Sequence, residues 1–129
     1  MHPRFRRTAV AAFVALLGPA LWVTAQHQHQ HEHGQPAGQA ASIKGEVVDL
    51  SCYLSGSPCN LKCAQACAKK GLPIGLLAAE GKLYLLIEDH SRAEAYKQAI
   101  GHAGHTVTVK GRVFEKGGLR ALQVQAVSG

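Results

Sequence analysis

Residues 106–127 read TVTVKGRVFEKGGLRALQVQAV, and they predict two long strands joined by a tight turn. Apolar and polar residues alternate through much of the stretch, which is the period of a half-buried strand. Gly111 interrupts the first strand, where a bulge or a bend is expected. Gly117-Gly118 then turns the chain into a last strand from Leu119 to Val127.

Upstream of residue 106, the sequence predicts three more strands and two helices. The predicted strands are residues 43–50, 74–78 and 83–88, and the predicted helices are residues 57–70 and 91–100. Ser57 as N-cap and Pro58 at the first helical position mark the start of the first helix. Ser91 and Glu94 have the spacing of a capping box at the start of the second helix.

The order of these elements indicates a fold class. Without the first helix, the order is β-β-β-α-β-β, which is that of an OB-fold, a five-stranded, partly open barrel with a helix between strands three and four. Gly45 and Gly111 fall in the first and fourth strands, where barrel strands coil sharply. The first helix is then an insertion between strands one and two, in a loop that OB-folds use for ligands. A small α+β sandwich is the alternative.

The N-terminal residues have the pattern of a targeting segment. Arg4, Arg6 and Arg7 precede an apolar stretch over residues 9–22, and Val23-Thr24-Ala25 has the small residues of a cleavage site. A membrane-spanning helix needs about 20 apolar residues, so a membrane anchor is the less favoured reading. We therefore expect a signal peptide over residues 1–25 and a periplasmic or secreted protein, attached to a membrane only if the signal is retained.

Residues 26–42 have no apolar period, which predicts a disordered linker before a folded domain at residues 43–128. Histidines alternate in this linker, namely His27, His29, His31 and His33. Imidazole suits Cu(II), zinc and nickel, so the linker is a candidate metal collector. A soluble linker without a metal function is the alternative.

Charge and composition argue against a nucleic-acid partner. The chain has net charge +6, but without Arg4, Arg6 and Arg7 it has 11 basic residues against 8 acidic ones and a net charge of +3. That is not the basic stripe that phosphate binding needs. The sequence contains no Ser/His/Asp spacing, phosphate-cradling glycine loop or paired-carboxylate motif, so we do not expect an enzyme.

Four cysteines carry the strongest chemical signal, namely Cys52, Cys59, Cys63 and Cys67. The last three are spaced four apart, so in a helix they share one stripe. Cys52 would reach in from the end of the first strand. Thiolates select Cu(I), zinc or iron–sulfur centres over hard ions. The cysteines are therefore candidate ligands of a tight transition-metal site, with copper ahead of zinc, and the histidines form a looser one.

Disulfide bonds are the alternative, because export brings an oxidising compartment. If one helix covers Cys59 and Cys67, these residues lie roughly 12 Å apart, too far for a bridge. That excludes the pairing that joins them, and the other two-bridge pairings each need a strained bond within the helix. A disulfide-stapled domain would bind a protein, a glycan or a small ligand. Redox catalysis is disfavoured because no Cys-x-x-Cys motif occurs.

The amino-acid sequence of the domain also resembles that of a known group of proteins. The segments that carry the resemblance are GEVVDLSCYL (45–54), CAQACAKKGLPIGLL (63–77), GKLYLLIEDH (81–90) and TVTVKGRVFEKGGLRALQV (106–124). They are similar to small exported bacterial OB-fold-like proteins. The resemblance implies the fold and the compartment, and it implies no activity.

Overall fold

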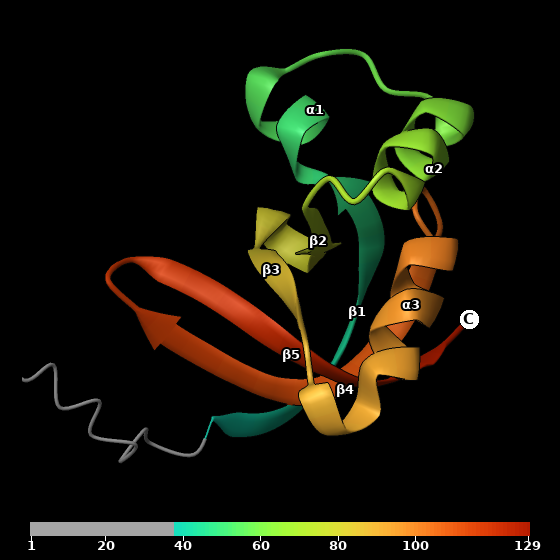
Figure 1. Ribbon diagram of the computed structural model, residues 1–129. Helices are drawn as coiled ribbons and strands as arrows, with labels where there is room; N and C mark the ends of the chain where they lie inside the picture. The colour runs from blue at the N-terminus through green and yellow to red at the C-terminus, as the bar shows by residue number, and fades with distance from the viewer. Residues whose placement is uncertain (1–37) are drawn as a thin grey trace, which may run out of the picture. The chain divides into compact units, whose positions relative to one another are not determined.

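The computed structural model describes residues 38–129, which form a five-stranded closed barrel with helices (Figure 1). The strands are β1 (Gln39–Asp49), β2 (Ile74–Ala78), β3 (Leu83–Glu88), β4 (Thr106–Lys116) and β5 (Leu119–Ser128). The helices are α1 (Leu50–Ser55), α2 (Leu61–Lys69) and α3 (Ala93–Gly101), with short 3₁₀ turns η1 (Ala79–Gly81) and η2 (His90–Arg92).

The strand order around the barrel is β1-β2-β3-β5-β4, with β4 pairing back to β1. Neighbouring strands are antiparallel except β3 and β5, which are parallel. Helix α3 connects β3 to β4, and α1 and α2 form the insertion between β1 and β2. This connectivity confirms the predicted OB-fold-like barrel with an inserted cysteine-bearing segment.

The core is built from the inward-facing residues of every strand. Alternation places the odd-numbered residues of the second half of β1 inside, including Val47. The largest fully buried side chains are Val47, Ile74, Leu76, Leu86, Val107, Val109, Leu122 and Val124. Small residues of the helices complete the core, and α2 contacts both α3 and β1. These small residues are Ala64, Ala68, Ala95 and Ala99. The insertion is thereby anchored to the barrel by its second helix.

Two strand glycines are required by close backbone approach. The pairing of β4 with β5 shifts register between Lys110 and Gly111, which confirms the predicted irregularity. A Cβ at Gly111 would collide with the carbonyl oxygen of Gln123, and one at Gly45 would lie 2.6 Å from the carbonyl oxygen of Leu77. These positions let β1 and β4 coil around the barrel.

Strand β1 begins earlier than the sequence predicts. It starts at Gln39, four residues before Ile43, and its first residues pair with β4, from Gln39 opposite Val113 to Ser42 opposite Lys110. Residues 39–42 have little β-propensity of their own, so the long partner strand orders them. The end of the predicted disordered linker is therefore wrong, and residues 1–37 lie outside the described part of the chain.

The predicted capping box at Ser91 and Glu94 does not form. Asp89 instead accepts hydrogen bonds from the Ser91 backbone N–H at 3.0 Å and from the Ser91 hydroxyl at 2.7 Å. A carboxylate is the stronger acceptor, and it begins the 3₁₀ turn η2 before α3 starts at Ala93.

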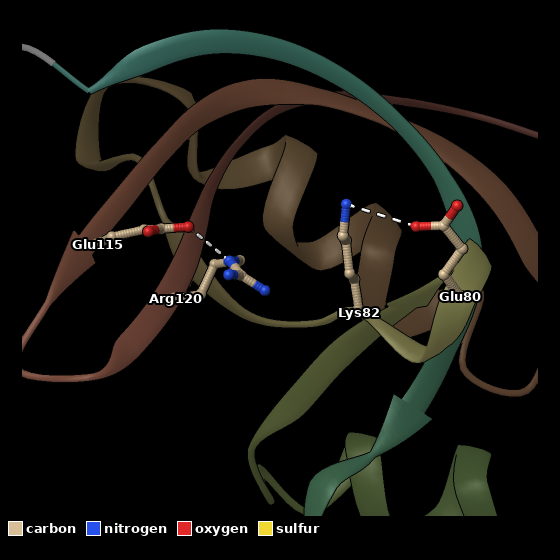
Figure 2. Close-up of polar contacts among 4 residues, drawn as sticks. All are labelled: Glu80, Lys82, Glu115 and Arg120. Atoms are coloured by element: carbon tan, nitrogen blue, oxygen red, sulfur yellow. Dashed lines mark hydrogen bonds and ion pairs between the residues drawn. The ribbon is translucent and has the colours of Figure 1, made fainter.

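Surface ion pairs lie on two turns of the barrel (Figure 2). Lys82 and Glu80 are 3.6 Å apart in the β2–β3 turn, and Arg120 lies 2.6 Å from Glu115 in the β4–β5 hairpin. Both pairs are exposed to solvent, so each contributes little to stability. No helix within residues 38–129 is long and apolar enough to cross a membrane.

Candidate metal centre

Cys52 is positioned by the N-terminus of α1. Asp49 ends β1 and N-caps α1, where its Oδ1 accepts a hydrogen bond from the Cys52 backbone N–H at 2.7 Å. Gly56, with φ of 67°, ends the helix after Ser55. Cys52 therefore reaches the cluster from just beyond the end of β1, as predicted, but it lies in a helix that the sequence did not predict, because the cap turns the chain into a helix immediately after Asp49.

Cys63 is positioned in the same way by α2. Asn60 N-caps this helix, and its Oδ1 accepts from the Cys63 backbone N–H at 3.0 Å. The predicted helix start at Ser57 and Pro58 is wrong, since the Ser57 hydroxyl instead pairs with the Ser55 hydroxyl at 2.9 Å. Cys59 consequently lies before the helix, outside the predicted stripe.

The two cysteines share a local motif. Asp49-Leu50-Ser51-Cys52 and Asn60-Leu61-Lys62-Cys63 each place a cysteine three residues after an N-cap. The capping bond fixes the backbone of that cysteine in the first helical turn. This repeated cap-x-x-Cys pattern is visible in the sequence, and it is the signal that could have predicted both helix starts.

The side chains of the cysteines converge although they come from three segments. The Sγ atoms of Cys52, Cys59 and Cys63, which we call the outer trio, lie within 4.8 Å of one another. Cys67 is one turn after Cys63 in α2, and its Sγ lies within 4.8 Å of Cys52 Sγ and of a carboxylate oxygen of Asp49. The structure thus brings together all four cysteines that the sequence singled out.

All four cysteines are free thiols, with Cys59 exposed and the other three half-buried. The sequence-based argument against a disulfide bond between Cys59 and Cys67 assumed that one helix contains both residues. Helix α2 begins only at Leu61, so that geometric exclusion does not hold.

The thiols have unequal acidities. The neighbouring Asp49 carboxylate, and then the Cys59 thiol, raise the pKa of Cys52. A hydrogen bond to Cys63 raises the pKa of Cys59, and burial raises that of Cys67. The pKa of Cys63 is lowered, mainly by its interaction with the neighbouring Cys59 thiol. Cys63 is therefore the first thiolate of the cluster and the first ligand available to a metal ion.

Asp49 is the site residue that sequence reasoning missed. Its side chain is 3% exposed, and Oδ2 has no hydrogen-bond partner. Buried carboxylate oxygens are normally paired, because burial without a partner costs free energy. In the sequence Asp49 is the polar end of a strand, and only its capping relation to Cys52 marks it as part of the cluster.

A pocket of about 240 Å³ opens beside the cluster. Asp49, Cys52 and Cys59 line one part of it, and Tyr53 and Leu61 line another. Tyr53 and Leu61 are also among the exposed large side chains. The pocket gives an ion or a small ligand access to Cys52 and Cys59 from solvent.

Among the described residues, no histidine joins the cysteine cluster. His27, His29, His31 and His33 lie outside the described residues. Within residues 38–129, no group of three or more candidate ligands contains His102 or His105. The His105 ring lies 3.5 Å from the Gln65 side chain instead.

A scan against protein-family models and searches of curated proteins and of solved structures found no match.

Proposed function

We propose that this protein binds a soft transition-metal ion, Cu(I) in preference to zinc, through its cysteine cluster. The observation that carries the proposal is the outer trio, three free thiols whose sulfur atoms lie within 4.8 Å of one another. Cu(I) selects thiolate ligands and accepts two or three of them.

The trio needs little rearrangement to hold an ion. Three sulfurs at a metal–sulfur distance of about 2.3 Å stand about 4 Å apart in a planar site. N-caps fix two of the three cysteine backbones, at Cys52 and Cys63. Side-chain rotation is then sufficient to close the site, so little conformational entropy is lost on binding.

The number of ligands favours copper over zinc at this trio. A structural zinc ion takes four tetrahedral ligands, and Cys67 is the only further thiol. Cys67 Sγ lies within 4.8 Å of Cys52 Sγ and of an Asp49 carboxylate oxygen, and it is not part of the outer trio. A three-coordinate Cu(I) ion needs no fourth ligand.

Competition with a chromophoric Cu(I) chelator tests the proposal on the reduced full-length chain. We expect one Cu(I) per chain at the trio. A Cys63→Ala variant should bind Cu(I) at least about 100-fold more weakly, because loss of a ligand exceeds the 10–100-fold effect of losing a residue that only hydrogen-bonds to a ligand. Ser51→Ala, an exposed neighbour of Cys52, is the matched control and should leave binding unchanged. Equal affinities of wild type and Cys63→Ala would contradict the proposal.

The alternative function is a disulfide-stapled barrel that binds a protein, a glycan or a small ligand. Intact mass, thiol alkylation and metal analysis of protein purified from its own host separate the two functions. Protection of Cys52, Cys59 and Cys63 from alkylation until a chelator is added supports the metal centre. Two disulfide bonds without bound metal would rule it out.

Export and the role of the histidines belong to the same proposal. The pattern of residues 1–25 supports a cleaved signal peptide and a periplasmic or secreted protein, and the alternating histidines support a loose metal collector. The role proposed is binding rather than catalysis. Edman sequencing of the exported protein should begin at Gln26.

A further inference from the structure

We propose that Asp49, Cys52 and Cys67 form a second, inner metal subsite that takes a borderline divalent cation of the zinc class. The inner subsite shares Cys52 with the outer trio, so the cluster holds two different ions. This inference rests on the proposed function and deepens it by assigning a ligand set that contains a carboxylate.

The first observation is the Asp49 side chain itself. It is 3% exposed, and its Oδ1 is occupied by the Cys52 backbone N–H at 2.7 Å. Its Oδ2 has no hydrogen-bond donor, and no ion pair within residues 38–129 involves Asp49. A cation bound at Oδ2 would compensate the cost of burying this oxygen.

The second observation is the position of the two sulfur atoms. A carboxylate oxygen of Asp49, Cys52 Sγ and Cys67 Sγ all lie within 4.8 Å of one another. Tetrahedral zinc holds sulfur at about 2.3 Å and carboxylate oxygen at about 2.0–2.2 Å, so its ligand atoms stand about 3.5–3.8 Å apart. The three groups can reach that geometry by small side-chain movements.

The chemistry of the donor atoms separates the two subsites. The outer trio offers sulfur alone, which favours Cu(I), whereas the inner set mixes oxygen and sulfur, which suits zinc. One carboxylate and two thiolates leave a fourth tetrahedral position for water.

Charge also favours two ions. Four thiolates and one carboxylate carry five negative charges when fully ionised, and a single Cu(I) ion neutralises one of them. A divalent ion at the inner subsite neutralises two more, close to the shared Cys52 sulfur. The attraction is strong because the Asp49 end of the cluster is buried, where water screens charges less.

Native mass spectrometry of the reduced full-length chain tests the inference. The chain is loaded with one equivalent of Cu(I) and then titrated with Zn²⁺ against a zinc chelator. We expect one copper and one zinc per wild-type chain. Asp49→Asn keeps the size of the side chain and a capping oxygen but replaces Oδ2 with an amide group that cannot ligate a metal. This variant should still bind copper, and its zinc affinity should fall at least about 100-fold. That loss exceeds the effect of mutating a residue that only hydrogen-bonds to a metal ligand.

Controls separate this inference from the function on which it rests. Cys67→Ala should also bind copper and lose zinc. It replaces Asp49→Asn as the test variant if circular dichroism shows that Asp49→Asn does not fold. Asp89→Asn changes another capping aspartate, at η2, and should leave both ions bound. A copper-loaded wild type that takes up no zinc, or zinc affinity that is unchanged in Asp49→Asn and in Cys67→Ala, would overturn the inner subsite alone. Failure to bind Cu(I) would overturn the proposed function.

Discussion

Asp49 and Asn60 show how single residues build the cluster. Each accepts a hydrogen bond from the backbone N–H of a cysteine three positions later, so one side chain both starts a helix and orients a ligand. The thiols then act on one another. The neighbouring Cys59 thiol lowers the pKa of Cys63, while the Asp49 carboxylate raises that of Cys52.

The unequal pKa values predict an order of deprotonation. A group with a lowered pKa loses its proton at a lower pH, so the pH midpoint of alkylation by iodoacetamide should be lowest for Cys63 and highest for Cys52. Peptide mass spectrometry after short pulses at different pH values measures each midpoint. Cys59→Ala removes the neighbouring thiol and should raise the Cys63 midpoint, and Ser51→Ala should not. A Cys52 midpoint below that of Cys63 would disprove this order.

The same directions predict the pH dependence of metal binding. Cys52 and Cys59 have raised pKa values and are protonated at neutral pH, so a metal ion must displace their protons. Cu(I) affinity should therefore rise with pH, and binding in weak buffer should release protons. Chelator competition from pH 6 to 8 measures this, and affinity that is independent of pH would contradict it.

At the scale of elements, the insertion consists of two short helices joined by the segment that contains Cys59. Helix α1 has 6 residues and α2 has 9, which is too short for either to be stable alone. The backbone N–H of Leu50 donates to the carbonyl of Pro73 at 3.0 Å and ties the start of the insertion to its end. Caps and packing on the barrel therefore decide whether the cysteines converge.

Loss of the α2 cap should reduce stability. Asn60→Ala removes the acceptor for the Cys63 N–H, and caps of this kind contribute about 0.5–2 kcal/mol. Urea unfolding of the metal-free chain should show a loss in this range, and Cu(I) affinity should fall as the first turn frays. Ser57→Ala, at the position first expected to be the cap, should change stability by less than about 0.5 kcal/mol. Equal losses in the two variants would exclude Asn60 as the cap.

Closure of the barrel should depend on Gly111. Gly111→Ala places a Cβ against the carbonyl oxygen of Gln123, so we expect destabilisation of about 1–3 kcal/mol. Gly101→Ala, near the end of α3, is the matched control because nothing lies within 4 Å of its Cβ. Urea midpoints of both variants measure the difference. A neutral Gly111→Ala would show that β4 and β5 separate at this point without cost.

At the scale of the whole molecule, the described part of the chain supplies the complete candidate site. The outer trio lies within residues 38–129 and contains no histidine. We therefore expect the histidines and the cysteines to bind metal independently. Deletion of residues 26–37 should leave Cu(I) affinity within about twofold, as for independent, additive sites. A larger loss in the chelator competition would show that the histidines contribute to the cluster.

Much of the fold was predictable because it depends on local periodicity and turn chemistry. The alternating residues of β4 and β5 and the glycine turn between them gave the hairpin, and element order gave the barrel. The start of β1 was not predictable in this way. Residues 39–42 are ordered by pairing with β4, a contact between segments about 70 residues apart.

The candidate metal ligands show the same division between local and tertiary contributions. The sequence by itself determined that four thiols occur close together, because their spacing is a local property. Only the tertiary structure decided how they group, because Cys52 lies in α1 and because α2 begins after Cys59. Burial of the Asp49 carboxylate at the junction of β1 and α1 was also decided there, because the exposure of a side chain depends on what distant segments pack over it.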